Sequence, residues 1–420
     1  MSSAYLTGDL PGIGGRIKDH PADFIVEEIP LYPAGGVGEH CYILIEKSGA
    51  TTLEIKNSLA RALGVKAMDI GYAGLKDARA VTRQRFSIFG LPSDRLRGLE
   101  LPNARIIEIT RHRNKIKIGH LAGNRFIIKI RHDDWVAHGG SVTDSLHRAE
   151  EILRRLINSG VPNFFGPQRF GMRGDNHLLG LVLLRGDAKE FMDRWLGDPD
   201  PERDHGSVLQ ARRHYMKKHF DLALAHWPGH LREERRALSI LVKKPDHYEK
   251  ALHAVDATLK RLLISALQAH LFNQTLEKRL SRLGQILPGD LAWIHENGAV
   301  FLVGPTEADA QTEQPRADAK EISPSGPMFG YRMTEPQGEP AAMEASVLSE
   351  HGLNPEAFRL PRSEKAKGSR RAMRFFPKEP DLGAGTDERG PFIQVGFSLP
   401  PGSFATVLLA EIMKTDVQAD

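Results

Sequence analysis

One carboxylate, Asp77, lies in a glycine-containing segment crowded with basic residues, which are Lys76, Arg79, Arg83 and Arg85. Nearby positive charge favours the ionised form of a carboxyl group, so we expect Asp77 to carry a negative charge. An ionised carboxylate can act as a nucleophile or as a base, and the basic groups could hold a polyanionic substrate beside it. The same segment is also typical of a surface turn with solvated arginines, because structural ion pairs perturb carboxylates too.

The usual motifs of cofactor and metal chemistry are missing from the sequence. There is no G-x-x-x-x-G-K-[ST] or G-x-G-x-x-G, and no H-E-x-x-H or G-x-S-x-G. Cys41 is the only cysteine, which excludes an intramolecular disulfide and a cysteine-based zinc site. His226 and His230 have helical metal-ligand spacing, but Pro228 and Gly229 between them argue against a helix. We therefore expect no metal and no cofactor, which leaves a carboxylate reaction as the enzymatic possibility.

Length and charge restrict the class of protein further. A chain of 420 residues exceeds the usual size of one hydrophobic core, so we expect about two domains. Lys and Arg exceed Asp and Glu by 57 to 53, which suits a nucleic-acid partner only if the positive charge is clustered. A single cysteine fits the reducing cytoplasm. Because there is neither a signal-peptide pattern nor an apolar run of membrane-spanning length, we expect a cytoplasmic protein that does not enter the membrane.

Basic side chains gather on two predicted strands, residues 106–118 and 126–130, which a turn at residues 119–124 would join. Strand alternation places many of these charges on one face of a sheet. That face could simply be solvated, or it could follow the phosphates of a nucleic acid, and the sequence supports both interpretations about evenly. The basic residues are Arg111, His112, Arg113, Lys115 and Lys117 on the first strand, and Arg125, Lys129 and Arg131 on the second.

Apolar periodicity predicts the elements that would position the Asp77 segment. A helix should begin at the capping box formed by Thr51 and Glu54 and should end at Gly64. Short strands are expected at residues 24–29, 41–45, 70–72 and 86–89.

The second half of the chain has a different, more helical character. An amphipathic helix over residues 142–159 should stop at Gly160, which marks a candidate domain boundary. Asn297 and Gly298 predict a hairpin turn, residues 306–327 are polar and loop-like, and Ser403 can cap a last helix after a strand at residues 392–399. Helices are also expected at residues 219–225, 232–242 and 247–283.

Several ordered motifs resemble those of the TruD family of tRNA pseudouridine synthases, and together they cover nearly the whole chain. Residues 73–84 are similar to the signature A-G-x-K-D-x-x-A-x-T-x-Q, which carries the catalytic aspartate of the family. Residues 160–171 resemble N-Y-F-G-x-Q-R-F-G, with Phe164 in place of the commoner tyrosine. The other matching segments are residues 21–28, 121–126, 265–273, 368–373 and 399–406.

The resemblance implies an α+β protein. Its catalytic domain would be a mixed, mainly antiparallel sheet with helices, built from both chain ends, and a family-specific α/β domain would be inserted in the middle. We place the first part of the catalytic domain at residues 1–159, the inserted domain at 160–374 and the second part at 375–420. The helix stop at Gly160 and the return of strand character after Arg374 agree with this arrangement.

The resemblance also implies roles for individual residues. Asp77 would be the catalytic carboxylate, Phe24 and Phe404 would stack on the uracil, at about 1–3 kcal/mol per base, and Asn124 could hydrogen-bond a uracil edge. Core packing of the two phenylalanines and a turn role for Asn124 remain open. Lys18, Glu28 and Phe126 are expected to support the site. The residues expected to bind RNA are Lys76, Arg79, Arg111, Arg113 and Lys115.

The function implied is the conversion of a tRNA uridine to pseudouridine, with the family suggesting position 13 in the D-arm. We expect a monomer whose only partner is tRNA. Two alternatives stay open, a non-catalytic RNA-binding or RNA-folding protein on the same scaffold and an unrelated hydrolase with an aspartate nucleophile. The intact Lys76-Asp77 pair argues against the first, and the lack of a metal or triad partner argues against the second.

Overall fold

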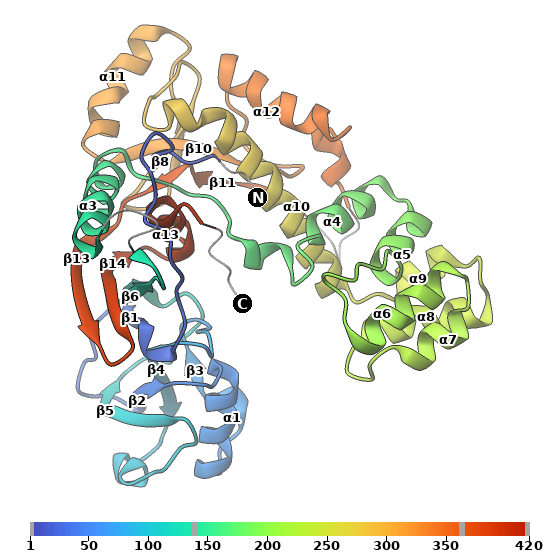
Figure 1. Ribbon diagram of the computed structural model, residues 1–420, viewed down its shortest axis with the longest axis horizontal. Coiled ribbons are helices and arrows are strands. Elements are labelled where there is room, and N and C mark those ends of the chain that lie inside the picture. Colours follow the sequence, from blue (N-terminus) through green and yellow to red (C-terminus); the bar gives the residue numbers. More distant parts are fainter. Residues whose placement is uncertain (1–3, 136–140, 361–365, 416–420) are drawn as a thin grey trace. The chain divides into compact units, whose positions relative to one another are not determined.

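The computed structural model describes residues 4–135, 141–360 and 366–415 (Figure 1). The chain divides into two compact units. The described residues of Tyr5–Asn163 and Phe375–Val417 form the first, here called the split unit. The second, here called the middle unit, is Phe164–Arg374. No helix within the described ranges is long and apolar enough to cross a membrane.

The split unit is built on an eight-stranded sheet, in which seven strands follow the order β13-β14-β6-β1-β4-β2-β5 and β3 pairs with β4. Only the β1–β4 pair is parallel among the described pairings of this sheet, so the sheet is mixed and mainly antiparallel, as predicted. The strands are β1 (Phe24–Pro30), β2 (His40–Lys47), β3 (Gly71–Tyr72), β4 (Val81–Phe89), β5 (Ala104–His112), β6 (Leu121–Arg131), β13 (Lys378–Asp387) and β14 (Gly390–Leu399).

The helices of the split unit include α1 (Thr52–Leu63), α3 (Val142–Ser159) and α13 (Ala405–Met413). The predicted capping box of α1 is confirmed: Thr51 Oγ1 accepts from the Glu54 amide, and the Glu54 carboxylate accepts from the Thr51 amide. Gly64 ends α1 at φ 67°, a left-handed conformation that favours glycine. The apolar face of α1 packs with strands β2 and β4 in a core that includes Ile43, Ile55, Leu59 and Phe86. Shorter elements are η1 (Pro21–Asp23), η2 (Ala67–Asp69), η3 (Ser93–Leu96) and β7 (Val161–Pro162).

The chain's two ends meet in one sheet. Strand β14 runs antiparallel to β6, from the pair Phe392 and Arg131 to the pair Leu399 and Asn124. Because β6 also pairs with β1, the end of the chain lies one strand away from β1. Residues more than 250 positions apart in the sequence thus position each other.

The middle unit combines helices with a four-stranded sheet of order β11-β10-β8-β9. Its strands are β8 (Leu291–Ile294), β9 (Val300–Leu302), β10 (Ile322–Met328) and β11 (Ser369–Ala372), and β12 (Arg374–Phe375) follows. Its helices are α4 (Asn176–Arg185), α5 (Ala188–Leu196), α6 (Gly206–Met216), α7 (Phe220–His226), α8 (Arg232–Lys243), α9 (Tyr248–Ala254), α10 (Ala257–Arg279), α11 (Glu307–Asp318) and α12 (Gly338–Glu350), with η4 (Pro167–Phe170), η5 (Leu280–Arg282) and η6 (Pro355–Phe358).

Several sequence-based expectations about these elements were wrong. The expected long helix of residues 247–283 is broken between α9 and α10, where Asp256 caps α10 by accepting from the Thr258 amide. Residues 306–327 are not a loop, because they contain α11 and most of β10. The last helix begins after Phe404, and no side chain caps it, so Ser403 is not its cap.

The predicted basic strand of residues 106–118 ends at His112. Beyond it the chain leaves the sheet, because Tyr42 donates its hydroxyl proton to the Asn114 carbonyl and Ser87 Oγ accepts from the Ile116 amide. Strand β6 begins at Leu121 and is not a neighbour of β5 in the sheet. The basic side chains of the two segments therefore do not lie on adjacent strands.

Candidate active site

The loop between β3 and β4, residues 73–80, carries Asp77 and is held by buried polar side chains. Thr52, the first residue of α1, accepts from the Lys76 amide at 2.8 Å and donates to Gln84 Oε1 at 2.7 Å. Gln84, on β4, donates in turn to the Gly74 carbonyl at 3.2 Å. Thr52 and Gln84 have no exposed surface, so a helix start and a strand centre fix the backbone of the loop on both sides of Leu75.

Lys47 also holds this loop, and no sequence motif indicates its role. Its ammonium donates to the Ala50 carbonyl at 2.8 Å and to the Asp77 carbonyl at 2.9 Å, and its side chain is only 1% exposed. Burial lowers the pKa of Lys47 to about 8. The only available signal was a lysine at the end of the apolar strand β2, because the carbonyls that Lys47 binds are set by the fold.

The Asp77 carboxylate points to solvent while its backbone is fixed. Its side chain is 62% exposed, and Lys18 Nζ lies 3.4 Å from Asp77 Oδ2. The Lys18 side chain is only 7% exposed, and its ammonium also lies 4.8 Å from the centre of the Phe24 ring. Lys18 has a left-handed backbone, at φ 62°, which is unusual for a residue with a side chain. The structure thus brings together three of the residues predicted from the sequence.

Lys76 is buried, in contrast to the exposed Asp77 beside it in the sequence. Its side chain is 6% exposed, and Nζ lies 2.5 Å from Asn124 Oδ1 and 3.6 Å from Glu28 Oε2. Glu28 and Asn124 are directly opposite each other on β1 and β6, so one sheet register positions both. Burial lowers the pKa of Lys76 and raises the pKa of Glu28. With its oxygen bound to Lys76, the Asn124 amide can present its NH₂ group to a ligand.

Two of the aromatic candidates, Phe24 and Phe126, lie on the same strands β1 and β6. Phe24 is buried and contacts Phe126 edge to face, with ring centres 6.2 Å apart. Phe126 in turn lies beside Phe397 of β14, its partner in the sheet register, at 5.6 Å. Phe404 occupies the N-cap position of α13, five residues after Leu399, which pairs with Asn124. The chain's end therefore supplies part of the surroundings of β6.

The remaining basic candidates are spread more widely. Arg79 and Arg113 are exposed. Arg111 lies on the edge strand β5 and donates to the carbonyls of Gly38 and Leu91, at 3.3 and 3.1 Å. The Lys115 ammonium donates to the Met68 carbonyl at 2.8 Å. Arg111 and Lys115 thus bind backbone in the structure, and of these four residues Arg79 alone lies on the Asp77 loop.

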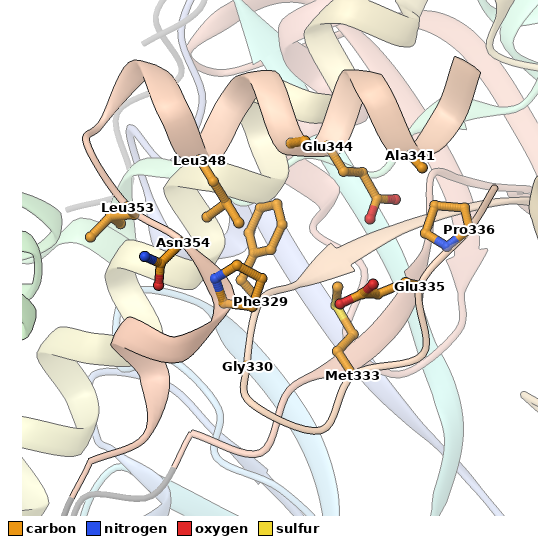
Figure 2. A pocket seen from close by; sticks show the side chains of 12 residues that line it. Phe329, Gly330, Met333, Glu335, Pro336, Ala341, Glu344, Leu348, Leu353 and Asn354 are labelled. Atoms are coloured by element: carbon orange, nitrogen blue, oxygen red, sulfur yellow. The ribbon is translucent and has the colours of Figure 1, made fainter. Parts of the chain in front are cut away.

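A separate cavity of about 220 Å³ lies in the middle unit, between α12 and the segment after β10 (Figure 2). Its walls are mostly apolar, and Figure 2 shows the carboxylates of Glu335 and Glu344 pointing into it. Glu344 forms a two-pronged ion pair with Arg370, at 2.6 and 2.9 Å. None of the candidate residues predicted from the sequence lines this cavity. In the part of the chain that the structure describes, no group of His, Cys, Asp and Glu residues is arranged to hold a metal ion.

Known proteins resemble this chain over nearly its whole length. A family model described as tRNA pseudouridine synthase D (TruD) matches residues 1–412. The chain is 46% identical over 417 residues to tRNA pseudouridine synthase D of Geobacter sulfurreducens, covering 98% of this chain and 97% of that protein. It is 38% identical over 416 residues to a tRNA pseudouridine synthase D of Thermus thermophilus, covering 98% and 92%.

A solved structure from Methanosarcina mazei, described as a putative tRNA pseudouridine synthase D (TruD), has the same fold. It matches with a TM-score of 0.86 at 27% sequence identity, covering 98% of this chain and 96% of the other. The similarity therefore extends over both units, and it confirms the predicted α+β fold class.

Proposed function

The chain belongs to the TruD family of tRNA pseudouridine synthases, which are isomerases, and from this premise we propose that Asp77 is the carboxylate with which it converts a tRNA uridine to pseudouridine. The observation that carries the proposal is the contrast at Asp77. Its backbone is fixed by buried groups, whereas its carboxylate is exposed beside one ammonium group. An aspartate with only a structural role would not require a rigid backbone that keeps its carboxylate exposed to solvent.

The reaction breaks the bond between N1 of uracil and C1′ of the ribose and forms a bond between C5 and C1′. The base must turn while it is detached, a proton leaves C5, and N1 gains one. Substrate and product are isomers, so the balance requires no redox partner, no energy source and no cofactor. Asp77 can act as a nucleophile toward the ribose or the base, or it can take a proton from the sugar.

The surrounding residues have complementary roles in this proposal. The uridine must leave its stack, which costs a few kcal/mol. Asn124 would then donate from its NH₂ group to a uracil oxygen, and Lys76 and Glu28 would orient it. Lys18 would position the Asp77 carboxylate, Phe24 and Phe126 would form the apolar wall, and Phe404 would stack on the base.

The units also receive roles in the proposal. The split unit would be the catalytic domain and the middle unit the family-specific insertion, in a monomeric cytoplasmic enzyme. Its target would be the D-arm uridine at position 13, with Arg79, Arg111, Arg113 and Lys115 near the RNA backbone.

The test is Asp77→Asn, which keeps the shape of the side chain but removes its charge. Single-turnover conversion of uridine in a tRNA transcript should slow by more than about a thousandfold, because the group that does the chemistry is lost. Affinity for tRNA should stay near that of the wild type, since phosphate contacts supply most of it. Asp94→Asn is the matched control, because Asp94 is 82% exposed in the same unit and pairs only with Arg97 among its described ion pairs.

Turnover by a folded Asp77→Asn protein within tenfold of the wild type would contradict the assignment of Asp77. Tight tRNA binding by a wild type that forms no pseudouridine in any tRNA would instead favour the non-catalytic RNA-binding alternative.

A further inference from the structure

The loop that carries Asp77 also displays one large apolar side chain, Leu75, which the proposed chemistry does not use. Leu75 is 67% exposed and the Asp77 side chain is 62% exposed, whereas the Lys76 side chain between them is only 6% exposed. This alternation is typical of an extended backbone, in which residues i and i+2 lie on the same face. The leucine and the carboxylate are therefore presented to solvent side by side.

The backbone on both sides of Leu75 is held by hydrogen bonds. Buried Gln84 and Thr52 bind the residues directly before and after it. One residue earlier, the Ala73 carbonyl accepts from the Gly119 amide at 2.8 Å. Single exposed leucines are common on protein surfaces, but the loop cannot withdraw this one from solvent without breaking these bonds.

Leu75 is close to the proposed reacting group. Two residues span at most about 7 Å of chain, so a nucleotide that reaches the Asp77 carboxylate also lies near the leucine. In a helical stem the base of that nucleotide is stacked between its neighbours and must leave the stack to react. Its departure leaves a gap whose walls are the apolar faces of the two neighbouring bases.

We propose that Leu75 enters the gap left by the target uridine and keeps the uracil out of its stack. The inference rests on the proposed function, because it requires a uridine that reacts at Asp77. Apolar side chains can insert between base steps and unstack them. Burial of a leucine side chain stabilises by an amount of the same order as the cost of unstacking one base, so this one side chain can offset much of that cost.

The chemistry of the side chain defines what Leu75 contributes. A polar side chain would lose its hydration between two base faces, whereas an aliphatic side chain gains from leaving water. Leucine has no hydrogen-bonding group with which to read a base edge. Leu75 is therefore a positioning residue, which favours extrusion of the uridine and leaves the bond changes to Asp77 and the choice of sequence to other contacts.

The test is Leu75→Ala, assayed with a tRNA transcript that the wild type converts. The single-turnover rate constant divided by the half-saturating enzyme concentration should fall about 10- to 50-fold, because three carbon groups lose their contact with the bases. The thermal unfolding midpoint should match that of the wild type, since an exposed side chain contributes little to folding. Ile107→Ala is the control and should convert uridine like the wild type, because Ile107 is 44% exposed on β5 of the same unit.

A second measurement separates extrusion from chemistry. Because Asp77→Asn should not complete the reaction, a 2-aminopurine placed next to the target uridine reports unstacking alone in its complex. The fluorescence should rise when Asp77→Asn binds the transcript, and the double variant Leu75→Ala/Asp77→Asn should lose most of that rise.

Two further substitutions separate apolar character from size. Leu75→Met keeps an apolar side chain of similar volume and should convert uridine within about threefold of the wild type. Leu75→Asn keeps much of the size but is polar, so it should be as defective as Leu75→Ala.

Unchanged conversion by Leu75→Ala, beside a wild type that forms pseudouridine, would overturn the inference and leave the proposed function standing. Equal fluorescence of Asp77→Asn and the double variant would also overturn it, and so would a lowered unfolding midpoint, because Leu75 would then support the fold. A wild type that forms no pseudouridine in any tRNA would contradict the proposed function instead.

Discussion

At the scale of single residues, the proposed reacting group and the groups that hold it in place are different residues. Asp77 presents its carboxylate to solvent, while Lys47, Thr52 and Gln84 hold the backbone around it from within the core. The motif context points to Asp77, whereas the only sequence signal for Lys47 is a lysine at the end of an apolar strand. The role of this lysine can be recognised only when the position of the 73–80 loop is known, because the lysine acts through the Asp77 carbonyl of that loop.

We predict that Lys47→Met lowers the free energy of unfolding by about 1–3 kcal/mol at neutral pH, because buried carbonyls lose their donor. The pKa of Lys47 is about 8 in the folded protein and 10.5 as an ordinary value, so the unfolded chain binds more protons between these values. Stability supplied by the lysine therefore rises with pH in that window, and the gap between wild type and variant should widen from pH 8 to 10.5.

Urea unfolding at several pH values checks this prediction, with Lys117→Met as the control, because Lys117 is exposed. If the difference in free energy of unfolding between wild type and variant instead narrows above pH 8, an ion pair rather than burial controls the pKa of Lys47.

At the scale of elements, the junction of β6 and β14 is the feature on which the site depends most. Asn124 pairs with Leu399 of β14 and with Glu28 of β1, so it is held between a strand near each end of the chain. Gly123, the residue before Asn124, has no space for a side chain, because a Cβ at this position would lie 2.3 Å from the Leu399 carbonyl oxygen.

We predict that Gly123→Ala destabilises the protein by about 1–3 kcal/mol, because a carbonyl of β14 must move. Turnover should also fall, since the shift displaces Asn124. Gly383→Ala is the matched control, because Gly383 lies on β13 of the same sheet and a Cβ there meets nothing within 4 Å in the described part of the chain. Thermal unfolding and single-turnover rates compare the two variants, and equal effects would refute the close packing at Gly123.

The sequence predicted these elements unequally. Helix α1 could be found because its cap, its apolar face and its final glycine all agree. Helix α11 was missed because it buries little more than Ala310 and Ala317, contains Pro315, and closes its capping box with Asp309 rather than with glutamate. The glycine before Asn124 leaves a turn role open for it, whereas pairing on both sides makes Asn124 part of a strand. Local sequence patterns predict a helix such as α1, but they do not predict the register between strands that are far apart in the sequence.

At the scale of the whole molecule, the modest net charge of +4 requires that affinity for RNA come from local clusters. The candidate carboxylate lies in the split unit, on a loop that carries several of the chain's basic residues. Family membership could be inferred from ordered motifs, whereas the hydrogen bonds by which Asn273 holds Phe165 became visible only when two separate motifs met in space.

We predict that activity survives removal of metal ions and needs no added nucleotide, because the proposed isomerisation is balanced without either. The measurement is pseudouridine formation after dialysis against EDTA, using a transcript folded beforehand in magnesium, since RNA itself requires the ion. Complete loss that returns only with zinc would contradict the prediction.

The pairing of β14 with β6 also has a meaning for synthesis on the ribosome. Strand β6 is made early, but its partner emerges about 260 residues later, after the entire middle unit. Until then the edge of β6 offers unpaired backbone groups to any other chain, while the middle unit can fold as a unit of its own. A ribosome that stops before β14 therefore releases a chain with an open sheet edge beside Asn124, and only a translation product that extends through Leu399 can close its own site.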